Sequence, residues 1–183
     1  MVLGKSGMRR SKPNLFTVAR APGRPARGIL RFRGAAFPVA LGRGSVKANK
    51  REGDGATPRG RFRLLRLWWR GDRLTKPRTG LPARRIEPND AWCEDEGDRR
   101  YNRPVRLQPG APGDRLWRED HLYDLIIELD YNTRPRIAGR GSAVFIHLAR
   151  TGFLPTAGCV ALQGGDLRRL LPRLGRHAWI EIR

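Results

Sequence analysis

The sequence predicts a mainly β fold with one or two short helices. Three observations support this prediction. Apolar residues gather in short runs of strand length, one segment near the C-terminus carries leucines at helical spacing, and strands and helices do not alternate regularly. With 183 residues, the chain is long enough for one compact domain with a real core and too short for two.

The N-terminal region is expected to contain a flexible tail followed by a hairpin. Residues 1–26 carry several Lys and Arg residues, several prolines and no acidic residue, without a sustained hydrophobic period. Such a segment buries too little apolar surface to fold, so we expect a mobile basic tail, with the domain itself spanning residues 27–183. Residues 29–33 and 37–41 read as two short strands separated by Gly34, which predicts a β-hairpin.

The middle of the chain is expected to be rich in loops. Residues 50–62 contain several glycines and a proline, which exclude regular structure over most of this length. The apolar run at residues 62–69 predicts a strand. Residues 70–112 have few apolar periods and many Pro, Asp and Arg residues, so a long functional loop fits this segment better than a second domain.

The C-terminal part carries the clearest elements. Residues 125–129 predict a strand, and the almost fully apolar residues 142–147 predict a central, buried one. Asp166 reads as the N-cap of a helix with leucines at helical spacing, which a proline shortens or kinks. Residues 179–182 predict a last strand. The leucines of the helix are Leu167, Leu170, Leu171 and Leu174, and the proline is Pro172.

The chain is strongly basic, with 38 Lys and Arg residues against 17 Asp and Glu residues and a formal net charge of +21. Such a charge attracts anionic partners, of which nucleic acid is the usual one. The arginines are scattered, however, and the sequence has no zinc-ligand spacing, no RNP-like aromatic box and no helix-turn-helix pattern. We therefore expect no specific nucleic acid partner, and a basic nucleic-acid-binding protein without catalysis remains an alternative.

The hydrophobic pattern predicts no membrane span. Hydrophobic residues make up 39% of the chain and occur in short runs, none of which could cross a bilayer. A secretory signal peptide would need an apolar run of about 7–15 residues behind a basic start. The N-terminus has an arginine pair but no such run, so the sequence contains no clear signal peptide.

Cys159 and His147 are the strongest candidates for chemistry. His147 ends the buried strand predicted at 142–147, and Cys159 follows in a loop beside Gly158. A cysteine attacks as its thiolate and needs a base or a cation nearby, which a histidine at a strand end can supply. The backbone N–H groups of Gly158 and Cys159 could hold an oxyanion. Thr156 could hydrogen-bond near this pair, or could simply stabilise the turn.

The two cysteines of the chain, Cys93 and Cys159, could also form a disulfide, and the sequence leaves this open. A catalytic Cys159 would have to stay reduced. The three histidines and two cysteines lack the spacing of metal ligands, so the sequence predicts no metal site, and nothing in it predicts a cofactor.

Four further residues are candidates for substrate contacts or for support of the catalytic pair. His121 and Tyr123 stand at the start of a strand, where a hydrogen-bonded structural role is the alternative for His121. Trp92 and Tyr101 could line a substrate cleft, whereas packing under a loop is the commoner use of such aromatic residues. The acidic residues 94–96 could recognise an ammonium group, but such a charge run is usually a solvated face.

Two segments resemble the L,D-transpeptidase (YkuD-like) family. Residues 145–147 (Phe-Ile-His) and 155–160 (Pro-Thr-Ala-Gly-Cys-Val) are similar to the family's motif, in which a strand-end His precedes a Ser/Thr-His-Gly-Cys turn. Residues 50–62 resemble the family's Thr-Pro-x-Gly-x-Phe segment, in the same order along the chain. The resemblance covers about residues 28–183. Residues 92–93, 101–105 and 121–124 resemble an atypical branch of the family, and Ala157 stands in place of the usual His.

The resemblance implies a β-sandwich-like catalytic domain in which Cys159 is the nucleophile and His147 activates it. It implies that Cys159 attacks a peptide carbonyl of a donor peptidoglycan stem peptide and expels a D-amino acid. The acyl group then passes to an amine of an acceptor stem, which gives a 3,3- or 1,3-type crosslink. Acylation by carbapenems and a location in the periplasm or cell envelope are also implied. An L,D-carboxypeptidase or endopeptidase, which passes the acyl group to water, is the alternative, and the oligomeric state stays open.

Overall fold

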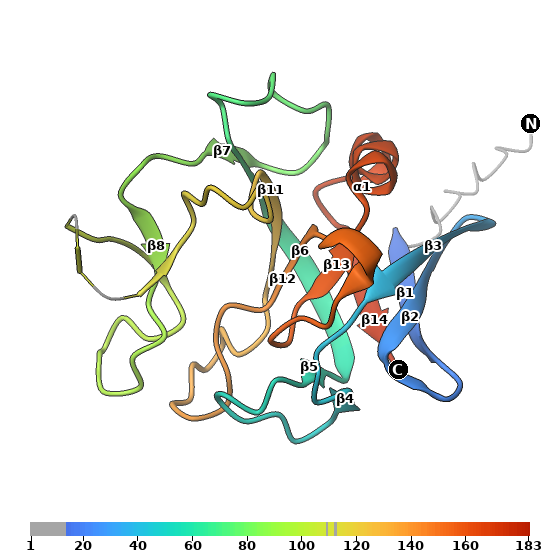
Figure 1. The fold of residues 1–183 in the computed structure, drawn as a ribbon, viewed down its shortest axis with the longest axis horizontal. Helices are drawn as coiled ribbons and strands as arrows, with labels where there is room; N and C mark the ends of the chain where they lie inside the picture. Colours follow the sequence, from blue (N-terminus) through green and yellow to red (C-terminus); the bar gives the residue numbers. More distant parts are fainter. Residues whose placement is uncertain (1–13, 109, 112) are drawn as a thin grey trace, which may run out of the picture.

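Most strands of the protein belong to one large sheet (Figure 1). The computed structural model describes residues 14–108, 110–111 and 113–183. The strands of the large sheet are β1 (Leu15–Ala21), β2 (Arg24–Phe32), β3 (Ala35–Ala40), β6 (Gly60–Trp69), β7 (Ala83–Arg85), β11 (Leu125–Leu129), β12 (Phe145–Leu148), β13 (Val160–Leu162) and β14 (Trp179–Ile182).

The large sheet closes on itself. Its strands follow the order β11-β12-β13-β3-β2-β1-β14-β6-β7, and β11 also pairs with β6. Because β11 borders both β12 and β6, the strands form a ring to which β7 is attached through β6. The pairs β1–β14, β12–β13 and β6–β7 are parallel, and the other neighbours in the sheet are antiparallel. The mainly β fold class predicted from the sequence is confirmed.

Two smaller sheets and a few helical turns complete the described residues. The parallel pair consists of β4 (Val46–Lys47) and β5 (Thr57–Pro58), and the antiparallel sheet β10-β8-β9 consists of β8 (Asp90–Trp92), β9 (Pro104–Arg106) and β10 (Asp114–Arg115). The helices are the 3-10 turn η1 (Thr151–Phe153), the α-helix α1 (Gly164–Leu170) and the 3-10 turn η2 (Leu171–Arg173). In this part of the chain, no helix has the length and apolar character needed to cross a membrane.

Several strands predicted from the sequence are confirmed. Residues 62–69, 125–129 and 179–182 lie in β6, β11 and β14. The hairpin predicted from residues 29–33 and 37–41 is formed by β2 and β3, which pair antiparallel. These segments share clear apolar runs, which is why the pattern identified them.

The prediction of a flexible tail is wrong for residues 15–26. These residues form β1 and the start of β2, and β1 pairs with both β2 and β14. Phe16 and Val18 are buried in the main core, with polar and small residues between them, so a short alternation hidden among basic residues is enough to add a strand. The part of the tail prediction that concerns residues 1–13 lies outside the described residues.

The helix also begins earlier than predicted. Gln163 is the N-cap residue of α1, and Asp166 lies in the first turn rather than at the N-cap. Asp166 still has a physical role there, since a carboxylate near a helix N-terminus interacts favourably with the helix dipole. Pro172 cannot donate a backbone hydrogen bond, and the chain accordingly tightens into η2 after Leu170.

The segment at residues 70–112 is more ordered than a long loop. It contributes β7 to the large sheet, and β8 and β9 to the small sheet that lies on the opposite side of the molecule from β1–β3 (Figure 1). Because β8 also pairs with β10, this segment and the residues up to the start of β11 form one compact region beside the large sheet. The segment therefore forms neither an open loop nor a separate second domain.

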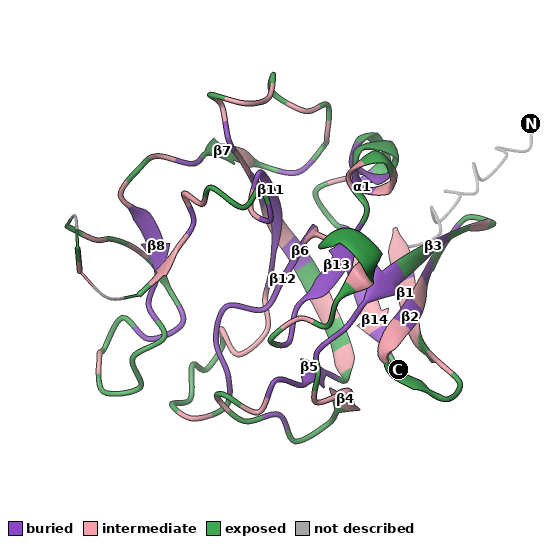
Figure 2. Ribbon diagram, viewed as in Figure 1, coloured by how far each residue is buried: buried purple, intermediate pink, exposed green. Residues whose placement is uncertain are grey.

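Strands β11 and β12 bury side chains on both of their faces (Figure 2). On one face, Ile127 and Ile146 join the main core, which collects side chains from every strand of the ring and from α1. On the other face, Ile126 and Phe145 join a second, smaller cluster that includes Cys159. Each fully buried aliphatic or aromatic side chain contributes about 1.5–3 kcal/mol relative to an exposed one. Two-sided burial makes these strands the rigid support of the second cluster.

Candidate active site

Cys159 and His147 come from neighbouring parallel strands. In the β12–β13 ladder Ile146 lies opposite Val160, and Cys159 immediately precedes β13. The N–H of Phe145 donates to Cys159 Sγ over 3.4 Å, which places the thiol beside the start of β12. Alternate residues of a strand share a face, so His147 lies on the same side as Phe145, roughly 7 Å further along the strand. The strand register therefore brings the thiol and the imidazole to one face of the sheet.

The tautomer of His147 follows from its hydrogen bond. Nδ1 lies 2.8 Å from the carbonyl oxygen of Leu148. A carbonyl oxygen can only accept, so Nδ1 carries the proton and Nε2 is left as a base. The ring packs edge to face against Tyr123, with ring centroids 5.4 Å apart. Burial, together with the charges of Arg118 and Arg150, lowers the pKa of His147 to about 4, so the imidazole is neutral at neutral pH.

The thiol of Cys159 is buried and rests in its neutral form. Sγ donates to the carbonyl oxygen of Ala143 over 3.2 Å and accepts from the N–H of Phe145. Burial raises the pKa of Cys159 to about 12, although the Phe145 N–H favours the thiolate. Because His147 is a neutral base and Cys159 a neutral thiol, proton transfer between them has to accompany attack on a carbonyl.

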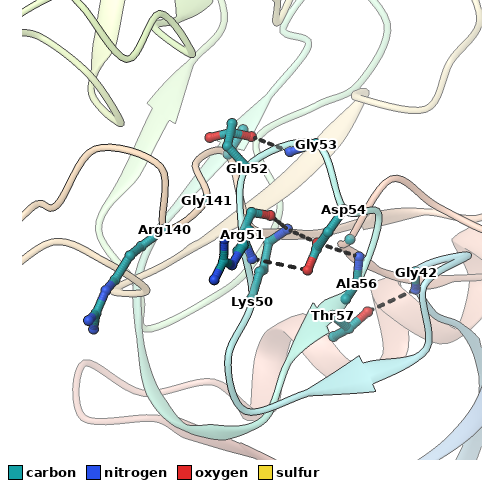
Figure 3. A network of polar contacts seen from close by, with 12 residues as sticks. Gly42, Lys50, Arg51, Glu52, Gly53, Asp54, Ala56, Thr57, Arg140 and Gly141 are labelled. Carbon is teal, nitrogen blue, oxygen red and sulfur yellow. Dashed lines mark hydrogen bonds and ion pairs between the residues drawn. The ribbon is translucent and has the colours of Figure 1, made fainter.

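Two threonine hydroxyls hold the turn that precedes β13. Thr156 Oγ1 donates to the carbonyl oxygen of Cys159 over 2.7 Å and accepts the N–H of Gly158 over 3.1 Å. Thr57 Oγ1, from β5, donates to the same carbonyl over 3.5 Å and accepts the N–H of Gly42 over 2.8 Å (Figure 3). The Thr-Pro segment and the cysteine turn, which are far apart in the sequence, are thus joined at the backbone of Cys159.

Cys159 and His147 both line one cavity of about 530 Å³. A cavity of this size can enclose a short peptide segment. Basic and acidic side chains face the same space, so the cavity is suited to a substrate that carries both an ammonium and a carboxylate group. The charged lining residues, besides His147, are Arg43, Lys50, Glu52, Glu94, Asp114, Arg118 and Arg150.

Two acidic residues of the cavity have raised pKa values. Glu94 is exposed but partly desolvated where it lines the cavity, and this desolvation, together with the carboxylates of Asp114 and Glu52 and against the charge of Lys50, raises its pKa to about 7. Burial likewise raises the pKa of Asp114, against the stabilising charge of Arg118, which lies 3.7 Å away. The solvated face that the sequence suggested for residues 94–96 is confirmed, since all three residues are exposed, and Glu94 also lines the cavity.

Tyr123 and His121, although close in sequence, lie in different surroundings. Tyr123 lines the cavity, and its hydroxyl donates to Asp114 over 3.2 Å. His121 is not among the residues that line the cavity, and its side chain is largely exposed. Its Nδ1 lies 2.8 Å from Asp124 Oδ2, and its φ of 61° places it in a turn. Of these two residues, Tyr123 is therefore the one that a substrate in the cavity can contact.

Trp92 and Tyr101 lie one layer behind the cavity. Trp92 packs edge to face on Phe145, with ring centroids 4.9 Å apart, and its indole N–H donates to Asn102 over 2.9 Å. Tyr101 is buried, and its hydroxyl donates to Glu52, which does line the cavity. Tyr101 thus supports a residue that faces the cavity, whereas Trp92 packs in the cluster that contains Cys159.

Both cysteines are reduced in the structure. Cys93 and Cys159 are buried and free, so the disulfide that the sequence left open is not formed. Across the described ranges, no group of three or more His, Cys, Asp or Glu residues could hold a metal ion. The chemistry that the cavity offers is accordingly that of a thiol beside a neutral imidazole.

Sequence reasoning did not single out most of the charged residues of the cavity, among them Lys50, Asp114 and Arg118. Lys50 begins the segment at residues 50–62 that already carried the family resemblance, which is the signal that could have pointed to it. Asp114 and Arg118 belong to a region without strong periodicity, and only the pairing of β8 with β10 brings them to the site.

The comparisons with known proteins identify a family. The model of the YkuD family, described as the L,D-transpeptidase catalytic domain, matches residues 27–182. No curated protein and no solved structure matches the chain. The matched range contains both strands that carry Cys159 and His147, together with the Thr-Pro segment. Since the match extends over nearly the whole chain, the protein belongs to the L,D-transpeptidase catalytic domain (YkuD) family.

Proposed function

We propose that this chain is a peptidoglycan L,D-transpeptidase that joins stem peptides through a thioester on Cys159. The family to which it belongs acts on peptidoglycan stem peptides. The observation that carries the proposal is the β12–β13 register, which puts Cys159 and His147 on one face of the sheet and in one cavity. A thiol and a neutral imidazole so placed are the two groups that acyl transfer by a cysteine needs.

In the first half-reaction, Cys159 Sγ attacks the carbonyl carbon that precedes the terminal D-amino acid of the donor stem. His147 Nε2 takes the thiol proton as the S–C bond forms, and returns it to the departing amine as the C–N bond breaks. The products are a thioester on Cys159 and a free D-amino acid. The Nδ1–H bond to Leu148 holds the imidazole in the tautomer that this transfer requires.

In the second half-reaction, an amine of the acceptor stem attacks the thioester carbonyl. His147 removes a proton from this amine and delivers it to Sγ as the C–S bond breaks, which restores the thiol. We assign the oxyanion of both tetrahedral intermediates to the N–H of Cys159. The N–H of Gly158 joins it when its bond to Thr156 Oγ1 opens.

The charged lining of the cavity fits the two ends of such substrates. We assign the acidic side, with Glu52, Glu94 and Asp114, to the acceptor ammonium, and the basic side, with Arg43 and Arg150, to stem carboxylates. We also place the enzyme in the periplasm or cell envelope, where this substrate lies. A fusion of the intact N-terminus to a reporter that is active only outside the cytoplasm would be active if this is correct and silent if it is not.

The test is incubation of purified wild-type and Cys159→Ala protein with stem-peptide muropeptides, with the products followed by intact mass. We expect crosslinked dimers with loss of a D-amino acid for the wild type alone, and fragmentation of the dimers identifies the donor residue. Shortened monomers without dimers would instead indicate an L,D-carboxypeptidase or endopeptidase. No product from either protein, together with salt-dependent nucleic acid binding that both share, would favour the basic binding protein.

Acylation by a carbapenem provides an independent measure of the nucleophile. We expect the wild type to gain the mass of the antibiotic and Cys159→Ala to gain none. Cys93→Ala is the matched control, because Cys93 is the other buried free thiol but does not line the cavity. This control should be acylated as the wild type is.

A further inference from the structure

Lys50 is a buried lysine beside the candidate nucleophile. Only 4% of its side chain is exposed, and Nζ donates to Asp54 Oδ1 over 3.0 Å and to the carbonyl oxygen of Arg51 over 3.2 Å. Figure 3 shows this ammonium on the inside of the loop at residues 50–56. An ammonium has three N–H groups, so these contacts within the described residues leave one donor over.

Two glycines border the Lys50 side chain. A Cβ on Gly141 would lie 2.8 Å from Lys50 Cε and would clash with it, whereas a Cβ on Gly158 would lie 2.8 Å from the carbonyl oxygen of Ala56 and in ordinary contact with Nζ at 3.4 Å. Both glycines have positive φ values, 97° and 142°, a region that other residues rarely adopt. The backbone that leads into β12 is thus shaped around this lysine, and Nζ lies close to the turn that ends in Cys159.

Lys50 lies close enough to Cys159 for its positive charge to lower the pKa of the thiol. Gly158, against which Nζ lies, is the residue before Cys159, and Lys50 and Cys159 line the same cavity. The positive charge of Lys50 lowers the pKa of Cys159, in opposition to the burial that raises it. Burying an ammonium is unfavourable unless it is paired, and a methionine could fill this space without that cost. Packing alone therefore does not explain a lysine here.

We propose that Lys50 is a positioning residue of the reaction, whose ammonium stabilises the negative charge of the Cys159 thiolate as it forms. The proposal rests on the proposed function in taking Cys159 as the nucleophile. Asp54 holds the ammonium in place through the same carboxylate that accepts the N–H groups of Arg51 and Ala56. The loop at residues 50–56 thus holds the ammonium group of Lys50 in a fixed position next to the turn that contains Cys159.

The other charged and titratable groups around Cys159 set the size of this effect. On the acidic side, the carboxylates of Asp114 and Glu94 raise the pKa of Cys159 and oppose Lys50. His147 in β12 is neutral at neutral pH, so it provides no positive charge before the proton transfer. Lys50 already carries its positive charge in the resting site, where it favours the thiolate of Cys159. The remaining titratable or charged residues of the cavity are Arg43, Glu52, Arg118, Tyr123 and Arg150.

The test measures the rate at which iodoacetamide alkylates Cys159, in a Cys93→Ala background that leaves one thiol. Below the pKa of the thiol this rate is proportional to the thiolate fraction. We expect Lys50→Met to react about tenfold more slowly than its parent at about pH 8, as a rise of roughly one pKa unit requires. Lys50→Gln, which can still donate to Asp54 but carries no charge, should be slowed to a similar extent and serves if Lys50→Met does not fold.

Lys47→Met is the matched control, because Lys47 is an exposed lysine of β4 that does not line the cavity. This variant should react at the parental rate. If Lys50 only stabilises the loop, its replacement would lower the melting temperature and expose the buried thiol, so that alkylation would be as fast as in the parent or faster. That result would overturn the proposal. Alkylation needs no peptidoglycan, so it tests the charge of Lys50 even if no crosslinked product is found.

Discussion

The two faces of β11 and β12 pack against different surroundings. The face toward the main core presents only aliphatic side chains, such as Ile127 and Ile146. The opposite face presents Ile126 and Phe145 to the second cluster, and also carries the buried polar residues Glu128 and His147. Both faces belong to the same two strands, because successive side chains of a strand point to opposite sides of the sheet.

The two faces have different roles: the main-core face stabilises the fold, and the opposite face carries the groups that can react. Aliphatic side chains on the main-core face lose no hydrogen bonds on burial, so they stabilise the fold without further requirements. Buried polar groups on the other face need partners, and Glu128 accepts the indole N–H of Trp68 over 3.0 Å and pairs with Arg66. Burial also sets the protonation of His147 and Cys159. The second face is thus less stabilising than the main-core face, but it holds the groups that can react, His147 and Cys159.

The largest expected effect is loss of activity without loss of structure. His147→Asn removes the base, and the asparagine amide can still donate to the carbonyl of Leu148. We expect kcat/KM for muropeptide crosslinking to fall by about 10²–10⁴-fold, the usual contribution of a general base. The melting temperature at pH values above neutrality should change little. Wild-type activity in this variant would show that His147 does not act as the base.

A pair of neighbouring substitutions tests the separation of the faces directly. Ile127→Ala and Ile126→Ala each remove a fully buried side chain, and each should destabilise the protein by about 2–5 kcal/mol in urea denaturation. Per folded molecule, Ile127→Ala should keep the crosslinking activity. Ile126→Ala should lose part of it, because Ile126 packs in the cluster that contains Phe145 and Cys159. Equal losses of activity in both variants would mean that the two faces are not separate in function.

The sequence predicted the parts of the fold where one strong pattern dominates. The apolar runs of β6, β11 and β14 identified these strands, and the His-to-Cys motif identified both residues of the candidate pair. The strand β1 was missed because only Phe16 and Val18 carry its pattern and basic residues surround them. Its stability comes from pairing with β2 and β14, which a local pattern does not contain.

The charged lining of the cavity could not be predicted for a similar reason. Lys50, Glu94 and Asp114 lie in segments without hydrophobic periodicity, and they meet only when the loop at residues 50–56 and the small sheet pack against β12 and the cysteine turn. The charge run at residues 94–96 predicts a solvated face, and these residues are exposed, but only the tertiary structure adds Glu94 to the cavity lining and raises its pKa. Environment is a property of the tertiary structure, which the local sequence does not determine.

The smallest of the expected effects is a pH dependence of stability that originates on the second face. Burial lowers the pKa of His147 from 6.5 to about 4, so the unfolded chain binds a proton at a higher pH than the folded protein does. Stability that is complete above about pH 6.5 should therefore decrease as the pH falls toward 4, by at most about 3 kcal/mol. Raised pKa values of Glu94, Asp114 and Glu128 act in the opposite direction. The measurement must therefore isolate the histidine.

Urea denaturation of wild type and His147→Asn across this pH range isolates it, because the carboxylates contribute equally to both proteins. The difference in unfolding free energy between them should shift in favour of His147→Asn as the pH falls. His177→Gln, which replaces an exposed histidine, is the control and should follow the wild type. A difference between wild type and His147→Asn that does not change with pH would mean that His147 is not held neutral by burial. The contrast between the faces would then rest on the thiol alone.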